Sequence, residues 1–126
     1  MNSKTVIHNE QCNDRSTIHL YYNNEMHSWI SYGYSAYSLR VLSKDRGIDT
    51  LQGFSTQKCM PYTVVNKDML KRLRHSVSIK QGEDAKHYIV AVSKEFDTND
   101  YARWTDELRE ALEANGGFDT QTHVSH

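Results

Sequence analysis

Basic residues gather in one short stretch of this sequence, where they could contact phosphate groups. Positions 67–80 hold six of them against a single acidic residue, Asp68: Lys67, Lys71, Arg72, Arg74, His75 and Lys80. Helical spacing would place Lys67, Lys71 and Arg74 on the same side of a helix. Lysine and arginine are the residues that neutralise nucleic-acid phosphates. The stretch is therefore either a patch that contacts phosphates or a partner, or an ordinary solvated helix face.

Histidines are the second group that could carry chemistry, because the chain has seven of them. They do not show the spacing of a helical metal site. His19 and His27 form the best pair, since a hairpin turning between them could bring the two rings opposite each other. A metal would then need a third ligand, such as Glu25 or Cys59. The alternative is two half-exposed histidines on the solvent face of a hairpin.

Nucleophiles and phosphate-binding loops give no support for catalysis. Cys59 stands beside Met60 and is predicted to be a buried apolar thiol. The sequence contains neither the G-x-S-x-G context of a nucleophile elbow nor a glycine-rich phosphate loop. Carboxylates cluster in "EDA" and "DTND", where turns and helix caps use them for backbone hydrogen bonds. We expect a protein that is not an enzyme and has no cofactor or metal.

Composition limits the protein to one domain with a small, aromatic-rich core. The 126 residues are 37% hydrophobic, a low share that eight Tyr, two Trp and three Phe partly offset. The net charge of −1 gives no overall cationic field, so any nucleic-acid contact needs a local patch. We expect Cys12 and Cys59 to be reduced thiols. Because no signal peptide or membrane-spanning run is present, we expect a cytoplasmic protein without a membrane partner.

Both ends of the chain are more polar than the middle. Residues 1–14 form a polar leader and residues 116–126 a polar tail that opens after a glycine pair, and we expect both to be disordered. The single domain is then expected over residues 15–115.

The first half of this domain predicts a hairpin followed by a helix. Ile18, Leu20 and Tyr22 alternate with polar or aromatic residues, "NNE" supplies turn residues, and alternation resumes at Met26. The period then changes between residues 34 and 42, which predicts a short helix ending near Gly47. The stretch 48–57 is expected to be one strand, interrupted at its glycine.

The second half predicts a capped basic helix, a buried strand and a final helix. Pro61 marks an edge or a turn, and Asn66 is a plausible N-cap for a helix with the apolar stripe Met69, Leu70 and Leu73. The run "HYIVAV" (87–92) predicts a central strand. Apolar spacing after "DTND" predicts a helix that docks through Trp104. We predict an α+β fold with a mixed sheet of four to six strands and about three helices.

The order of these elements resembles the N-terminal mismatch-recognition domain (domain I) of the MutS family. "MHSWISYGYSA" (26–36) is similar to that domain's aromatic motif, and "CMPYTVV", "MLKRL" and "VSI" are similar to its later parts, so the resemblance covers residues 18–80. It implies a stand-alone, MutS-like binding domain related to DNA mismatch repair. The family's wedge phenylalanine and its glutamate partner fall on Ser28 and Ile30, so the mismatch-reading pair is missing.

Two functions follow from the resemblance and the basic stretch. The first is a non-catalytic module that binds DNA or another nucleic acid through stacking aromatics and phosphate-binding cations. Its candidate site residues are Trp29, Tyr32, Tyr34, Lys67, Lys71, Arg72 and Arg74. The second is a protein-interaction or scaffold domain, in which the same aromatic surface docks a protein partner.

Overall fold

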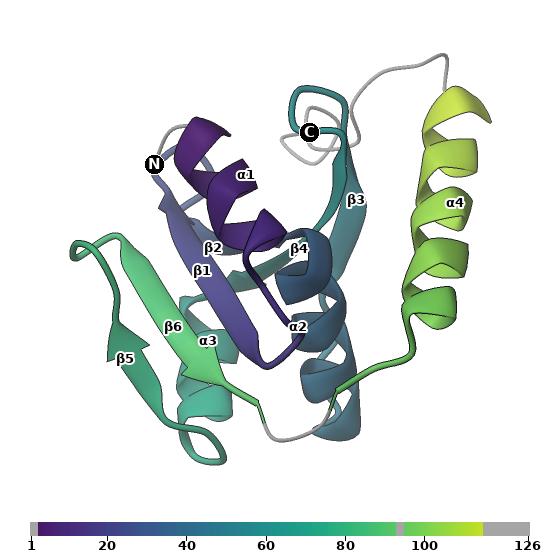
Figure 1. Ribbon diagram of the computed structural model, residues 1–126. Coiled ribbons are helices and arrows are strands. Elements are labelled where there is room, and N and C mark those ends of the chain that lie inside the picture. The colour runs from purple at the N-terminus through teal and green to yellow at the C-terminus, as the bar shows by residue number, and fades with distance from the viewer. Residues whose placement is uncertain (1–2, 93–94, 115–126) are drawn as a thin grey trace.

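The computed structural model describes residues 3–92 and 95–114 and contains a single antiparallel sheet with four helices (Figure 1). In chain order the elements are α1 (Ser3–Gln11), β1 (Thr17–Asn23), β2 (Ser28–Tyr32), α2 (Gly33–Asp45), β3 (Leu51–Ser55), β4 (Met60–Asn66), α3 (Lys67–Arg74), β5 (Ile79–Gln81), β6 (His87–Ala91) and α4 (Thr98–Ala114). The predicted α+β class is confirmed.

The six strands have the spatial order β3-β4-β2-β1-β6-β5. Each pair of neighbours is antiparallel, whereas the sequence predicted a mixed sheet. The position of β6 also differs from the prediction, because it lies next to the edge strand β5 and Ala91 is exposed. The two central strands are instead β2 and β1, and all five residues of β2 are buried. Its two neighbours, β1 and β4, shield it on both sides.

Alternation along the strands sends side chains to two faces, and both faces are covered. Ile18, Leu20 and Trp29 pack in one cluster with Leu39 of α2 and with the leucines of α3. Residues of opposite parity, including Tyr21, Ile30 and Tyr62, pack in a second cluster with Val6 of α1. Helix α4 lies beside β3, at the far side of the sheet from β5 (Figure 1).

Helix α1 corrects the prediction of a disordered leader for residues 3–11. Only Val6 and Glu10 of this helix are buried, and Val6 reaches the second cluster of the core. Two buried side chains in nine residues give no readable apolar stripe, so the helix depends on tertiary packing rather than on its own sequence pattern. The predicted tail, residues 116–126, lies outside the described residues.

The other helices follow their local sequence signals. Helix α2 begins at Gly33, whose φ of +59° is a conformation that glycine adopts at little cost. Asn66 caps α3 as predicted, since its side chain accepts a hydrogen bond from the Met69 N–H at 2.9 Å. Helix α4 buries Trp104, which packs with Ala36 and Tyr37 of α2. The predicted docking of the last helix through Trp104 is confirmed.

Cys12 and Cys59 are both exposed, so the prediction of a buried Cys59 is wrong. Cys59 has a φ of +54° in the turn between β3 and β4, and its thiol lies 3.5 Å from the Thr56 carbonyl oxygen of the same turn. Within residues 3–92 and 95–114, none of the helices has the length and apolar character needed to cross a membrane.

Candidate nucleic-acid interface

Helix α3 presents the basic residues of the sequence at the surface. Leu70 and Leu73 are buried and anchor the helix to the sheet, while Lys67, Lys71 and Arg74 are exposed. Asp68 lies in the first turn and the cations concentrate in the last turn. This is the distribution that the helix dipole favours. The helix is therefore a stable platform for positive charge.

The exposed side of α3 borders a groove of about 500 Å³, which we call the basic groove. Helix α3, strands β1 and β2, and the β5–β6 hairpin line it with nine residues: Tyr22, Trp29, Lys67, Leu70, Lys71, Arg74, Ala85, Lys86 and Tyr88. Four of these are cations and no carboxylate is among them. The groove therefore has the charge expected for an anionic ligand.

Three aromatic rings form the floor of the basic groove. Trp29 and Tyr88 are stacked, with ring centroids 4.1 Å apart and an angle of 13° between the planes. Tyr22 meets Trp29 edge-on at 5.2 Å. Trp29 is only 6% exposed, whereas Tyr22 and Tyr88 are half-buried. A ligand would therefore meet the edges of the two tyrosines before it met the indole.

The groove's cations are not neutralised by ion pairs in the part of the chain that the structure describes. The three ion pairs found there belong to Arg15, Arg103 and Arg109. The Arg74 guanidinium carbon lies 5.3 Å from the centre of the Tyr88 ring, a cation–π contact that orients the side chain over the floor. Such a guanidinium keeps its hydrogen-bond donors for a phosphate.

The structure brings four of the seven predicted site residues together. Lys67, Lys71 and Arg74 share one side of α3 as their spacing predicted, and Trp29 lies beneath them. Arg72 is exposed on α3 but is not part of the groove lining. Trp29 is a floor residue rather than the exposed stacking surface that was expected, because Tyr22 and Tyr88 cover it.

Tyr32 and Tyr34 lie away from the basic groove. Tyr32 is buried in the cluster that α1 covers, with the Lys58 amino group 4.7 Å from its ring centre. Tyr34 belongs to α2 and contacts the rings of Phe96 and Tyr101 edge-on. Both side chains help to hold the fold together, and neither reaches the cations of α3.

Sequence reasoning missed Tyr22, Tyr88 and Lys86 as parts of the groove. Tyr88 and Lys86 come from the β5–β6 hairpin, which reaches the groove because β6 pairs with β1. The pairing of Leu20 with Tyr88 could not be read from local sequence, since it joins distant segments. Tyr88 and Val90 are separated by one residue, so strand geometry places both side chains on the same face, which is the face that α3 covers. This spacing was a usable signal.

His19 pairs with His87 rather than with His27. The His19 Nδ1 and His87 Nε2 atoms are 3.0 Å apart, and the Glu83 N–H donates to His87 Nδ1 at 3.1 Å. His87 must therefore carry its proton on Nε2 and donate it to His19 Nδ1. Burial lowers the pKa of both rings, to about 4 for His19, where the charge of His87 adds to the effect.

The predicted partner His27 is exposed and lies in the β1–β2 turn, where Asn23 pairs with Ser28. That register places it beyond the end of the strands and far along the hairpin from His19. Among the described residues, no group of three or more histidines, cysteines and carboxylates is placed to hold a metal ion.

A buried carboxylate, Glu10, links α1 to the start of α2. Its Oε1 accepts from the Ser35 N–H at 3.0 Å, and its Oε2 accepts from the Ser35 hydroxyl at 2.6 Å. The Asn13 amide donates to Oε1 at 3.2 Å. Burial raises the pKa of Glu10 to about 7, although these hydrogen bonds act in the opposite direction. This group joins two helices and lies on the face of the sheet opposite the basic groove.

Comparison of the chain with protein-family models, with curated proteins and with solved structures gave no match. The MutS resemblance of residues 18–80 stays a prediction. The geometry and charge of the basic groove are therefore the best guide to the function of this chain.

Proposed function

We propose that this chain is a non-catalytic binding module that contacts the phosphate backbone of a nucleic acid through the basic groove. The observation that carries the proposal is the convergence of Lys67, Lys71, Arg74 and Lys86 around one aromatic floor without a carboxylate in the lining. Cations from α3 and from the β5–β6 hairpin would then contact the phosphates of one nucleic-acid strand from two sides. The MutS resemblance of residues 18–80 agrees with a DNA ligand.

Backbone contacts rather than base reading should dominate the affinity. Trp29 is 6% exposed, and its face is taken by Tyr88, so full stacking with a base would require the ring pair to separate. The groove leaves the edges of Tyr22 and Tyr88 for a base or a sugar. We therefore expect weak sequence preference and strong salt dependence.

Fluorescence anisotropy with labelled single-stranded DNA, RNA, duplex and mismatched duplex tests this function. Four phosphate contacts predict a log–log salt slope of about −2.8 for single strands and about −3.6 for duplex DNA. Charge reversal with Lys71→Glu and Arg74→Glu should remove about two contacts and reduce both slopes by half. The matched control, Lys4→Glu with Lys44→Glu, makes the same charge change at exposed positions of α1 and α2 outside the groove.

The result has two clear readings. Loss of binding in the α3 pair with retained binding in the control pair supports the groove. Undetectable binding of every nucleic acid at low salt, or equal loss in the two pairs, overturns the proposal and favours the alternative of a protein-interaction module. Circular dichroism of each variant confirms that the change in affinity is not a change in folding.

A further inference from the structure

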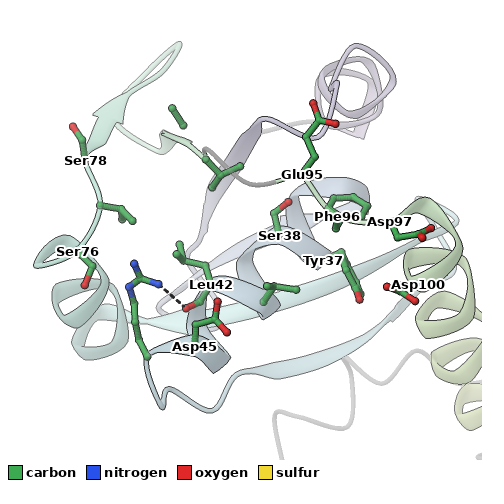
Figure 2. Close-up of a pocket in the computed structure, with 15 residues that line it drawn as sticks. Tyr37, Ser38, Leu42, Asp45, Ser76, Ser78, Glu95, Phe96, Asp97 and Asp100 are labelled. Carbon is green, nitrogen blue, oxygen red and sulfur yellow. Dashed lines mark hydrogen bonds between the residues drawn. The ribbon is translucent and has the colours of Figure 1, made fainter.

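A second pocket, of about 680 Å³, lies between α2, the segment after α3 and the segment before α4 (Figure 2). Four carboxylates line it, contributed by Asp45, Glu95, Asp97 and Asp100, and we call it the acidic pocket. Arg46 is the one cation in its described lining. The charge of this pocket is therefore opposite to that of the basic groove.

Two of the four carboxylates are only loosely engaged by nearby arginines. Glu95 lies 3.3 Å from Arg15, and Asp100 lies 3.7 Å from Arg103, and all four side chains are substantially solvated. Exposed pairs of this kind contribute little energy, so they compete weakly with an incoming cation. Asp45 is exposed. One carboxylate oxygen of Asp97 accepts a hydrogen bond from the Asn99 N–H at 2.7 Å, and the other oxygen stays available.

Apolar walls accompany these charges. Tyr37 and Phe96 meet edge-on at 4.8 Å on one side of the pocket, and Val41, Leu42 and Val77 line it elsewhere. Figure 2 shows Tyr37 and Phe96 close to Asp97 and Asp100, so aromatic and acidic groups occupy the same end. An alkyl chain that ended in a positive charge would find both of its parts accommodated here.

The floor contains hydrogen-bonding groups that have no partner. Ser38 is 7% exposed, lines the pocket from α2, and its hydroxyl makes no hydrogen bond. Figure 2 shows its side chain directed from the helix toward the space below Glu95. The Nε atom of Arg46 is likewise buried without a partner. Buried polar groups are normally satisfied, so unpartnered donors at a pocket indicate a ligand that brings acceptors.

We propose that the acidic pocket binds a lysine or arginine side chain presented by an extended peptide. Asp97 and Asp100, beside Phe96, take the charged end, the aromatic and aliphatic walls hold the alkyl stem, and peptide carbonyls accept from Ser38 and Arg46. A polyamine matches the charge and the stem but offers no acceptor oxygens. A metal ion matches the charge alone, and among the described residues no three histidines, cysteines or carboxylates are placed together to hold one.

Isothermal titration calorimetry of the full chain with blocked tripeptides tests this site. The probes are acetyl-Ala-Lys-Ala-amide and acetyl-Ala-Arg-Ala-amide, with norleucine at the central position as the uncharged control and spermidine as the polyamine control. We expect the two basic peptides to bind at least about tenfold more tightly than either control. Backbone amide shifts in NMR spectra should map the contact to Ser38, Leu42 and Phe96.

Two sets of variants separate the site from general acidity. Asp97→Asn with Asp100→Asn should weaken binding of the basic peptides about tenfold or more, and the asparagine at 97 retains the acceptor that caps α4. The matched control, Glu107→Gln with Glu110→Gln, removes the same charge from exposed positions of α4 outside the pocket. Ser38→Ala should weaken binding by a factor of roughly two to ten without reducing stability, because it removes an unpartnered hydroxyl.

Several results would overturn the proposal. They are absence of saturation up to about 10 mM basic peptide, equal binding of spermidine or the norleucine peptide, and equal loss in the α4 control. An unchanged affinity in Ser38→Ala would also contradict it, since the floor would then have no part in binding. Because the pocket does not share residues with the basic groove, these outcomes are independent of nucleic-acid binding.

Discussion

Replacing Glu10 by glutamine should change how the stability of the fold depends on pH. The carboxylate is 7% exposed, and its pKa of about 7 lies above the ordinary value of 4.5. The folded state therefore binds a proton that the unfolded state has released. Stability from this group is fully present below pH 4.5 and is lost as the pH rises through 7. A difference of about 2.5 pKa units corresponds to on the order of 3 kcal/mol.

The variant isolates this effect from that of the histidines. His19 has a lowered pKa of about 4, so its contribution is present above its ordinary value of 6.5 and is lost as the pH falls toward 4. The two trends oppose each other between pH 4.5 and 6.5 in the wild type. Glu10→Gln leaves His19 and His87 in place, so subtracting its unfolding free energy from that of the wild type cancels their contribution.

Urea unfolding of both proteins at several pH values between 4.5 and 8.5 measures this difference. We expect the wild type to lose on the order of 3 kcal/mol relative to Glu10→Gln, with the change falling between about pH 4.5 and 7 and little further change at higher pH. A difference that stays constant with pH would refute the reasoning, because it would mean that Glu10 titrates alike in the folded and unfolded states.

Three further changes test the packing and the local conformation through unfolding free energies in urea. Trp104→Ala should cost about 3–5 kcal/mol, because the side chain is buried and its Nε1–H donates to Gln52 at 3.0 Å, and a loss below about 1 kcal/mol would mean that α4 is peripheral. Asn66→Ala should cost about 1 kcal/mol through loss of the α3 cap, whereas Asn66→Asp should retain it. Gly33→Ala should cost about 1–3 kcal/mol, because φ is +59° and the added carbon would lie 3.1 Å from Met60 Sδ, and an unchanged stability would contradict this account.

Elements with a strong local pattern could be predicted from the sequence. The β1–β2 hairpin and the N-cap of α3 depend on residues that are close in the chain. The apolar spacing of α4 marked Trp104 as its docking residue, although its partners Ala36 and Tyr37 are distant in the chain. Alternation, capping and helical spacing are local signals, and here they agreed with the tertiary structure.

Features that depend on strand order could not be predicted in this way. The apolar run 87–92 resembles a central strand, yet β6 has only the three-residue β5 on its outer side. Helix α1 is held by Val6 and Glu10, and a buried glutamate reads as a surface residue in the sequence. The partner of His19 was likewise set by the β1–β6 register, which local sequence does not encode.

Only the α3 side of the candidate site could be predicted from the sequence. Helical periodicity alone predicted that Lys67, Lys71 and Arg74 share one side of α3, because this prediction does not depend on the order of the strands. The contribution of Lys86 and Tyr88 to the groove depends on a hairpin that returns to β1 from a distant part of the chain.

The two tryptophans occupy separate clusters of the core, and this gives the protein two internal fluorophores with different surroundings. Trp29 is stacked on Tyr88 beneath α3, whereas Trp104 donates a hydrogen bond to Gln52 beneath α4. Replacing either indole by phenylalanine would leave a single emitter at one known place. Stopped-flow emission from the two single-tryptophan proteins would then report whether the α3 and α4 sides of the sheet form in one kinetic step or in two.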